Sequence, residues 1–250
     1  PASTYKIVTA IAGLEEGVVD ESTTFFCPGY HKFGDRVFRC WRRGGHGNVN
    51  VREAIAWSCD VYFYQVGQKL GIDRLAWYAK AFGLGASTGI NLDHEGAGLV
   101  PTSIWKKRKI GIPWQKGETL SVAIGQGYNL TTPLQMATLT AAVANGGRIL
   151  KPIILKTIET VEGDVIKSAQ TEQVGVIPAS KKNFEIVKQG LWDVVNTRKG
   201  TAWIARVEGL KIAGKTGTAQ VVSRKKGDPE NREELEGFIK PHAWFVAYAP

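Results

Sequence analysis

Apolar residues recur every three or four positions along several stretches of the chain, and this pattern predicts a largely helical domain. Between residues 5 and 16 the apolar positions line one helix face, and Gly17 follows as a stop signal. Asn50 is a favourable N-cap for a helix that runs through about Ala56. Similar patterns predict further helices at 61–70, 73–82, 133–144 and 182–195.

Strand patterns are fewer and fall later in the chain. Residues 153–158 and 165–168 flank the turn sequence Glu-Gly-Asp and predict a hairpin. Residues 210–222 and 243–249 predict two more strands, separated by a polar, charged loop of about twenty residues. Helices followed by a few strands indicate the α+β class.

Two long segments show little periodicity of either kind. Residues 20–50 and 84–128 are rich in Gly, Pro, aromatic and charged residues, which predicts mostly irregular structure. The second segment closes with Gly-Gln-Gly-Tyr-Asn at 125–129. Irregular segments of this length are usually functional.

The composition is that of a globular chain: 250 residues, of which 43% are hydrophobic and 22% charged. No apolar run reaches the length of about eighteen residues that predicts a membrane span. The formal net charge of +9 suits an anionic partner. However, the basic clusters at 39–43, 106–109 and 224–226 lie in predicted loops, and no single basic helix gathers them. We therefore favour a solvated surface over nucleic-acid binding.

The sequence Ser-Thr-Tyr-Lys at 3–6 lies at the start of the first predicted helix. Helical positions three apart share a face, so the Ser3 hydroxyl and the Lys6 amine can come within hydrogen-bonding reach. A serine becomes a good nucleophile when a neighbour takes its proton. A lysine can do so only when neutral, which requires its pKa to fall from about 10.4 to about 7. Alone, the pair also fits an N-cap serine followed by a surface lysine.

Two further motifs supply the groups that such a serine would need. Ser-Cys-Asp at 58–60 lies at a predicted helix junction and offers a second hydroxyl and a carboxylate. Lys-Thr-Gly-Thr-Ala at 215–219 lies in a predicted strand, with a cation, two hydroxyls and a glycine that lets a substrate backbone approach closely. The residues that bear this chemistry are Ser58, Asp60, Lys215, Thr216, Gly217 and Thr218.

Together the three motifs are the signature of class A β-lactamases and penicillin-binding proteins. Segments along nearly the whole chain, including GHGNVNVREAIAWSCDVYFYQVG, AGKTGTAQ and HAWFVAYAP, resemble the transpeptidase domain of a class B penicillin-binding protein. The stretch GLVPTSIWKKRKIGIPWQKGET, with Asp60 where relatives commonly have Asn, resembles the elongation type, penicillin-binding protein 2. The resemblance implies a β-lactamase/transpeptidase-like α+β fold with an antiparallel sheet packed between helices.

The resemblance also implies that residues 1–250 form a partial transpeptidase domain, truncated at both ends. The N-terminal strands, pedestal, membrane anchor and C-terminal strand and helix of the family would lie outside this sequence. That family works at the periplasmic face of the bacterial inner membrane, where it cross-links peptidoglycan stem peptides during elongation. The partners implied are stem peptides, β-lactam antibiotics and elongation-complex membrane proteins including a glycosyltransferase, and acyl transfer itself requires no cofactor.

Carried onto the matching positions, the resemblance makes Ser3 the nucleophile that attacks the penultimate D-alanine carbonyl, and Lys6 its base. Ser58 would relay a proton to the leaving amine, and Asp60 would orient Lys6. Backbone N–H groups of Ser3 and Thr218 would form the oxyanion hole. The substrate carboxylate would be held by Lys215, Thr216 and Thr218. An aspartate at position 60 is a departure, because it cannot donate the hydrogen bond of an amide and favours a protonated lysine.

Three cysteines and a histidine form a candidate metal site. Cys27, Cys40, His46 and Cys59 are separated by 12, 5 and 12 residues, and thiolates with an imidazole suit tetrahedral zinc. Some elongation-type relatives hold a zinc in this segment, which supports the assignment; His31 is an alternative to His46. Two other readings stay open: a disulfide between Cys27 and Cys40 with Cys59 free, or three small apolar fillers.

Two rival functions remain for the same residues. A serine β-lactamase needs a second base to activate water, and no Glu-x-x-Leu-Asn pattern is present to supply one. A non-catalytic penicillin sensor, or a scaffold for elongation partners, would bind through the Trp-rich loops. Penicillin labelling tests these alternatives: persistent labelling that is lost in Ser3→Ala supports a transpeptidase, rapid turnover a lactamase, and no labelling a scaffold.

Overall fold

The computed structural model describes residues 1–220 and 240–249. Its helices are η1 (Ala2–Tyr5), α1 (Lys6–Glu15), α2 (Val51–Ala56), α3 (Asp60–Leu70), α4 (Ile72–Ala81), α5 (Ser103–Ile110), α6 (Lys116–Ala123), α7 (Pro133–Ala144), α8 (Lys181–Asn196) and η2 (Trp203–Ala205). Its strands are β1 (Phe25–Cys27), β2 (Tyr30–Phe33), β3 (Arg36–Arg39), β4 (Gly47–Val49), β5 (Arg148–Leu150), β6 (Thr157–Glu159), β7 (Val165–Ser168), β8 (Gln173–Val176), β9 (Ala213–Ala219) and β10 (His242–Tyr248).

Helix α1 is the centre of the body. Every residue from Lys6 to Leu14 is buried, because α1 packs against α3, α4 and α8 on different sides. A short 3-10 turn, η1, leads into it, and Ala2 there has a left-handed backbone (φ 53°). The Ala2 N–H donates to the Gly125 carbonyl at 2.9 Å, which fixes the start of the turn against the α6–α7 connection.

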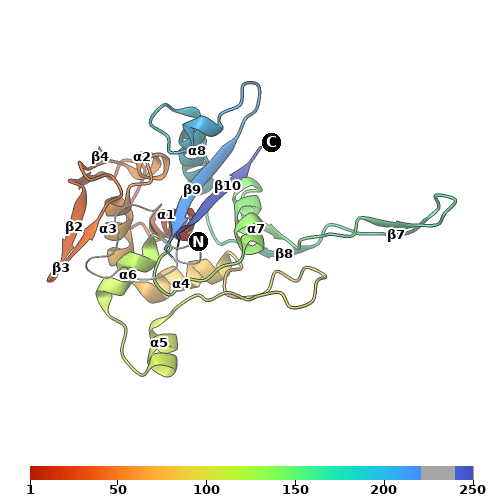
Figure 1. Ribbon diagram of the computed structural model, residues 1–250, viewed down its shortest axis with the longest axis horizontal. Coiled ribbons are helices and arrows are strands. Elements are labelled where there is room, and N and C mark those ends of the chain that lie inside the picture. The colour runs from red at the N-terminus through yellow and green to blue at the C-terminus, as the bar shows by residue number, and fades with distance from the viewer. Residues whose placement is uncertain (221–239, 250) are drawn as a thin grey trace.

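Strands β9 and β10 form an antiparallel pair between helices. Lys215 faces Val246 across the pair, and Gly217 faces Trp244. Helix α8 packs against β9, while α7 contacts β10 and η1 lies against β9. Figure 1 shows the pair beside α1, with α8 and α7 flanking it. This arrangement confirms the predicted α+β class with an antiparallel sheet between helices.

The predicted helices are present, with bounds within a few residues of those expected. Strong caps explain the agreement: Asn50 and Glu53 form a capping box at α2, and Thr132 accepts from the Gln135 N–H at the start of α7. The two late strands are also confirmed: β9 is shorter than predicted at both ends, and β10 begins and ends one residue earlier than predicted. The polar loop predicted between them lies almost wholly outside the described residues.

The two segments predicted as irregular contain short regular elements. Within 20–50 the chain forms β1 to β4, and β2 and β3 are joined by a two-residue loop at Gly34, whose φ of 56° suits a tight hairpin. Within 84–128 it forms α5 and α6, and α5 carries Lys106, Lys107, Arg108 and Lys109. The prediction that the basic cluster at 106–109 lies in a loop was therefore wrong, because α5 carries it.

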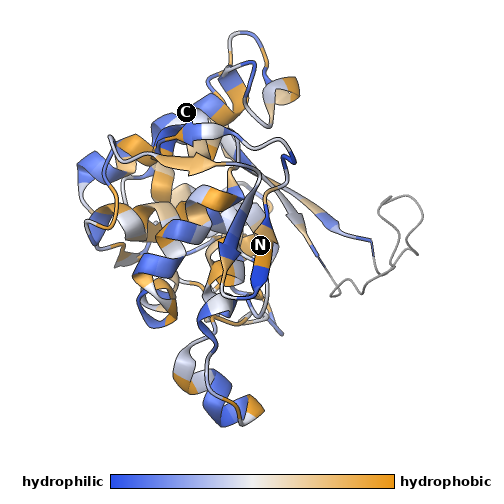
Figure 2. Cartoon of the chain, turned by 90° about the vertical axis from the view of Figure 1, so that its left-hand side faces the viewer, coloured by the Kyte–Doolittle hydropathy of each residue, from blue (hydrophilic) through white to orange (hydrophobic). Residues whose placement is uncertain are grey.

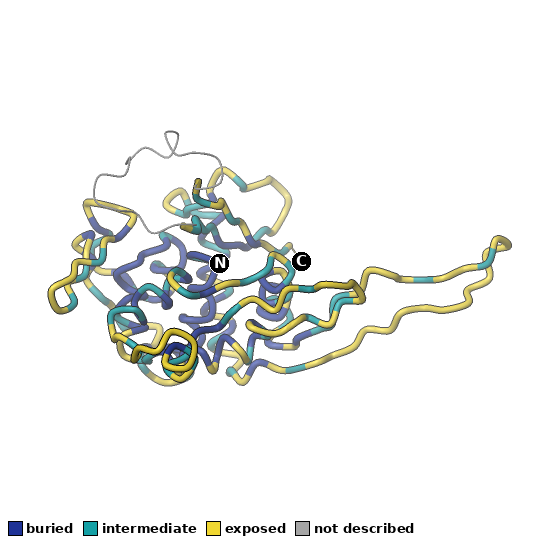
Figure 3. The backbone as a smooth tube through the Cα atoms, turned by 60° about the horizontal axis from the view of Figure 1, so that its bottom comes forward, coloured by how far each residue is buried: buried dark blue, intermediate teal, exposed yellow. Residues whose placement is uncertain are grey.

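The predicted hairpin between 153 and 168 is confirmed as β6 and β7. It extends far from the body as a narrow arm (Figure 1), and Figure 3 shows it exposed along most of its length. Among the described residues, no helix is long and apolar enough to cross a membrane.

Candidate active site

One cavity of about 780 Å³ brings the three motifs together. Ser3 reaches it from η1, Ser58 and Asp60 from the junction of α2 and α3, and residues 216–218 from β9. The remaining lining residues are Arg39, Cys40, Trp41, Tyr64, Ser121, Ile124, Gln126, Thr201, Gln220 and Pro241. Residues more than two hundred positions apart in sequence thus share one site.

Lys6 lies on the first turn of α1 with its side chain fully buried. Its ammonium donates to the Ser58 carbonyl at 2.9 Å, to Ser58 Oγ at 3.0 Å and to Asp60 Oδ1 at 2.7 Å. Three donors therefore meet three acceptors, all from the second motif. The lysine amine is therefore held between a serine hydroxyl and a carboxylate.

Ser58 sits in a strained turn between two helices. Helix α2 ends at Trp57, and Ser58 takes a left-handed backbone with φ of 53° before α3 begins at Asp60. A non-glycine residue adopts this conformation at a cost of about 1–3 kcal/mol, which surrounding contacts must offset. Here the turn brings the Ser58 carbonyl and hydroxyl to the same ammonium, that of Lys6.

Asp60 is held from two directions. One carboxylate oxygen binds Lys6, and the other accepts from the Trp41 backbone N–H at 2.9 Å. The Trp41 indole N–H donates to the Trp57 carbonyl at 3.0 Å, so the chain after β3 is fastened to the α2–α3 junction. Asp60 therefore links the catalytic lysine candidate to the segment that carries the cysteines.

Lys215 lies on β9 and is fully buried, and its ammonium donates to the Thr216 carbonyl at 3.2 Å. Burial holds its pKa well below the ordinary lysine value, the charge of Lys6 lowers it further, and the nearby Asp60 opposes the effect. Burial thus opposes the charged form of Lys215, and an anion bound beside its amine would favour that form.

The rest of β9 is positioned by side chains from other elements. Thr216 Oγ1 lies 2.8 Å from Thr201 Oγ1. Gly217 packs closely on η1: a Cβ there would lie 3.2 Å from the Pro1 carbonyl oxygen and from Thr4 Cγ2. Sequence reasoning assigned Gly217 to substrate approach, and that role stays a prediction; the glycine lines the cavity and also permits this close internal packing.

Gln126 is a site residue that the sequence did not single out. Its Nε2 donates to the Thr218 carbonyl at 3.0 Å, and its Oε1 accepts from the Gln220 N–H at 3.3 Å. The side chain therefore pairs with the end of β9 as a neighbouring strand would. Its only sequence signal is the pair of flanking glycines, Gly125 and Gly127, both with positive φ.

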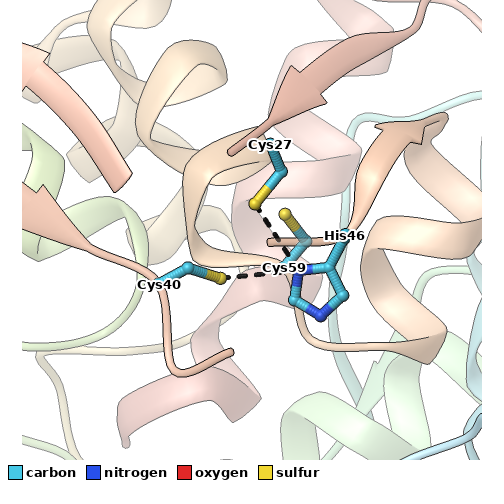
Figure 4. Close-up of side chains that lie close together, drawn as sticks. All are labelled: Cys27, Cys40, His46 and Cys59. Atoms are coloured by element: carbon cyan, nitrogen blue, oxygen red, sulfur yellow. Dashed lines mark hydrogen bonds between the residues drawn. The ribbon is translucent and has the colours of Figure 1, made fainter. Parts of the chain in front are cut away.

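The three cysteines and His46 converge (Figure 4), and their ligand atoms all lie within 4.8 Å of one another. His46 Nδ1 lies 3.6 Å from Cys27 Sγ and 3.5 Å from Cys40 Sγ, while Cys59 approaches from the α2–α3 junction. No disulfide joins them in the described structure, which includes every cysteine of the chain. His31 lies elsewhere, with Nε2 at 3.1 Å from Gln68 Oε1.

Contacts within the cluster favour thiolates. Hydrogen bonds from Cys59 and then His46 lower the pKa of Cys27 to about 6, and hydrogen bonds from Cys59 and His46 lower that of Cys40 as well. The hydrogen bonds of Cys59 with Cys27 and Cys40 raise the pKa of Cys59 itself. Burial lowers the pKa of His46, but its bonds to Cys40 and Cys27 outweigh this and raise it. The thiolate form is thus favoured at Cys27 and Cys40 and disfavoured at Cys59.

A helical body over an antiparallel strand pair, with a buried Ser-x-x-Lys lysine facing a second serine and a Lys-Thr-Gly strand, defines the class of penicillin-recognising active-site-serine folds. The comparison with protein families agrees with this class. The chain belongs to the penicillin binding protein transpeptidase domain family, whose model matches residues 1–250.

Known relatives point to the same family. The chain is 40% identical to the peptidoglycan D,D-transpeptidase MrdA of Haemophilus influenzae, a match that covers 100% of this chain and 39% of the relative. A solved complex of PBP2 with MreC from Helicobacter pylori superposes with a TM-score of 0.84 and 33% identity, over 99% of this chain and 42% of that one.

A second solved structure, described as a peptidoglycan synthase complex that coordinates polymerization and crosslinking, has a TM-score of 0.81 and 40% identity, over 100% of this chain and 39% of that one. The chain therefore spans about two fifths of the length of these relatives. The resemblance to penicillin-binding protein 2 drawn from the motifs is confirmed.

Proposed function

We propose that this chain carries the catalytic centre of an elongation-type peptidoglycan D,D-transpeptidase, which forms an acyl-enzyme with stem peptides and is acylated by penicillins. The observation that carries the proposal is the contact of the buried Lys6 ammonium with Ser58 Oγ at 3.0 Å, since Ser58 lines the same cavity as Ser3 and β9. The proposed nucleophile Ser3, the proton carrier Ser58 and the anion-binding strand β9 then line the same cavity.

In the first step, the Ser3 oxygen attacks the penultimate D-alanine carbonyl, and its proton passes to Lys6. Lys6 must first lose a proton, and Ser58 Oγ, which already accepts a hydrogen bond from it, offers the route. As the amide C–N bond breaks, Ser58 delivers a proton to the leaving terminal D-alanine. An amine from a second stem peptide then attacks the ester, forms the new amide and releases Ser3.

Lys215 and the two threonines of β9 bind the substrate carboxylate. Burial lowers the pKa of Lys215 in the free site, and a carboxylate bound beside its amine raises that pKa and stabilises the charged form. A charged hydrogen bond formed in this buried position is stronger than one in water. The carboxylate would lie against Lys215, Thr216 and Thr218.

The oxyanion hole is formed by backbone N–H groups of Ser3 and Thr218. One such donor is worth about 3 to 4 kcal/mol at the transition state, provided that it is held in place. Gln126 helps to hold the Thr218 N–H in place. Its side chain donates to the Thr218 carbonyl and accepts from the Gln220 N–H, which fixes the backbone at the end of β9. Gln126 therefore acts as a positioning residue for the hole.

We further propose a structural zinc held by the cysteine and histidine cluster. Tetrahedral zinc, with Zn–S bonds of about 2.3 Å and Zn–N bonds of about 2.0–2.1 Å, places sulfur and nitrogen ligands roughly 3.5–3.6 Å apart. His46 Nδ1 lies 3.6 and 3.5 Å from the sulfurs of Cys27 and Cys40, which fits that geometry. Four protein ligands fill the coordination shell, so the ion would order the segment and leave no open position for catalysis.

The zinc ligands adjoin the catalytic residues in sequence. Cys59 lies between Ser58 and Asp60, and Cys40 precedes Trp41, whose N–H binds Asp60. Binding Cys40 and Cys59 to one ion would hold the strained turn at Ser58. It would also hold Trp41, whose backbone N–H donates to the Asp60 carboxylate. Catalytic geometry would then depend on metal binding without any reaction step at the metal.

The relatives support a proposal for the partners of this protein. A PBP2 is known in complex with MreC, and a similar chain belongs to a peptidoglycan synthase complex that couples polymerization to crosslinking. We infer that the protein to which this chain belongs works with membrane proteins of an elongation complex, including a glycosyltransferase, at the periplasmic face of the inner membrane.

Fluorescent penicillin tests the proposal on the complete protein. Persistent labelling that disappears in Ser3→Ala, together with release of D-alanine from a peptide ending in D-Ala-D-Ala, is the expected result. Labelling that decays rapidly through turnover would identify a β-lactamase instead. Labelling without D-alanine release or cross-linking would identify a penicillin sensor, and no labelling would leave a scaffold.

A further inference from the structure

Helix α5 stands apart from the body. Figure 1 shows it at the bottom of the molecule, joined by extended chain on both sides, and Figure 2 shows it projecting with hydrophilic and hydrophobic residues mixed along it. The residues from 107 to 113 are all exposed, as are Gln115 and Lys116. We call residues 104–116 the α5 tip.

The base of this projection is firmly built. Lys106 is only 1% exposed, and its ammonium lies 2.5 and 2.7 Å from the two carboxylate oxygens of Glu118 on α6. Asp73 on α4 accepts from the Ser103 backbone N–H at 2.9 Å and from its hydroxyl at 2.7 Å. A buried ion pair and a helix-to-helix clamp therefore hold the tip in a fixed position, so its exposure is a property of the fold.

All the charged residues of the α5 tip are basic. Its exposed cations have no acidic neighbour in sequence, because residues 96–117 contain neither Asp nor Glu. Basic residues in the last turn of a helix complement its dipole, which accounts for part of this pattern. The helix dipole does not account for Lys116, which lies beyond the helix end. The exposed cations are Lys107, Arg108, Lys109 and Lys116.

Isoleucines lie among these cations. Ile104, Ile110 and Ile112 are 61%, 43% and 48% exposed. A single exposed isoleucine is ordinary, but three on one projecting basic element form a surface that is both apolar and cationic. This combination suits the boundary between phospholipid headgroups and acyl chains, where isoleucine enters the apolar layer and the cations meet phosphates.

We propose that the α5 tip docks on an anionic phospholipid surface. An acidic polymer would neutralise the cations but would leave the isoleucines in water, whereas a bilayer accommodates both. Each cation held near an anionic surface strengthens binding about fivefold, so removing three should weaken it on the order of 100-fold. This docking site is separate from the cavity and does not depend on the reaction performed there.

Flotation with lipid vesicles tests the proposal on the purified chain. The chain should float with vesicles that contain phosphatidylglycerol, should not float with phosphatidylcholine alone, and should be released by salt. Replacing Lys107, Arg108 and Lys109 by Gln should lower affinity on the order of 100-fold. Ile110→Ser with Ile112→Ser should lower it about tenfold at unchanged charge. Equal circular dichroism spectra confirm that each variant is folded.

A matched control removes the same charge elsewhere. Lys181, Lys182 and Lys211 are exposed, and replacing all three by Gln should leave affinity within about twofold. Equal loss in this control would overturn the proposal, because binding would then follow net charge alone. Unchanged affinity in the isoleucine variant, together with displacement by polyglutamate, would assign the tip to acidic polymers instead.

Discussion

Lys6 and Asp60 form a buried ion pair, with the ammonium 2.7 Å from Oδ1 and side-chain exposures of 0% and 10%. This pair joins the first and second motifs, and it sets the central question of the mechanism. A base must be neutral, yet Asp60 stabilises the charged form of its neighbour. Breaking one side of such a pair is costly, so the carboxylate has to be exchanged for a neutral group of the same shape.

Asp60→Asn makes that exchange. Removing the negative partner deletes the Lys6–Asp60 ion pair, while the amide oxygen can still accept from the Trp41 N–H, which preserves the turn. The rate of penicillin acylation at a fixed pH should rise about tenfold, because the carboxylate no longer competes for the lysine that accepts the Ser3 proton. Stopped-flow acylation measures the rate. An unchanged or lower rate in a variant with an unchanged melting temperature would show that Asp60 does not restrain Lys6.

Lys215→Met should abolish acylation and stabilise the fold. The pKa of Lys215 is lowered in the folded state, so the unfolded chain binds more protons and stability rises with pH up to about 10.5. Methionine removes the cost of burying the cation, on the order of 1–3 kcal/mol at low pH. The gain should shrink as pH approaches 10.5. Thermal unfolding from pH 6 to 10 measures it; the exposed Lys211→Met is the control, and a destabilised variant would contradict the account.

Zinc should be present at one ion per chain, and Cys27→Ser should lose it. Cys27 does not line the cavity, yet its replacement should lower both the melting temperature and the acylation rate, because the turn at Ser58 loses its support. Elemental analysis and differential scanning calorimetry provide two readouts besides activity. A two-proton mass loss in the native protein, with no metal, would replace this interpretation by a disulfide.

Gln126→Ala should lower the acylation rate about tenfold while leaving the fold intact. Within the described residues the side chain bonds backbone groups of Thr218 and Gln220, so its loss loosens the oxyanion hole without emptying the cavity. The effect should fall on the acylation rate constant more than on the dissociation constant of the initial penicillin complex. Gln173→Ala, on the exposed strand β8, serves as the control. Equal effects of the two variants would remove Gln126 from the mechanism.

Local signals predicted the helices and late strands well. Helix α7 was found at its predicted bounds because Thr132, Pro133 and Asn145 mark both ends, and Asn50 marked α2 in the same way. Helices α5 and α6 were missed because their apolar positions do not form a continuous face: α5 buries Lys106 and exposes Ile104. Burial of that lysine depends on Glu118, twelve residues away, which no local window can reveal.

The candidate site was predicted as a set of residue types, and its geometry came from the fold. Spacing within the first motif places Ser3 and Lys6 on one turn, but the partners of Lys6 lie 52 and 54 residues away. Gln126 bonds backbone atoms over 90 residues distant, so its side chain leaves no sequence pattern. The roles of these residues stay predictions until the reaction is measured.

Mass spectrometry of the penicillin-treated protein tests the central claim most directly. Digestion should yield one peptide that carries the intact penicilloyl group, and fragmentation should locate the group on Ser3, with no adduct in Ser3→Ala. An adduct on Ser58 or on any other residue, or a penicilloyl group that persists in Ser3→Ala, would contradict the assignment of Ser3 as the nucleophile.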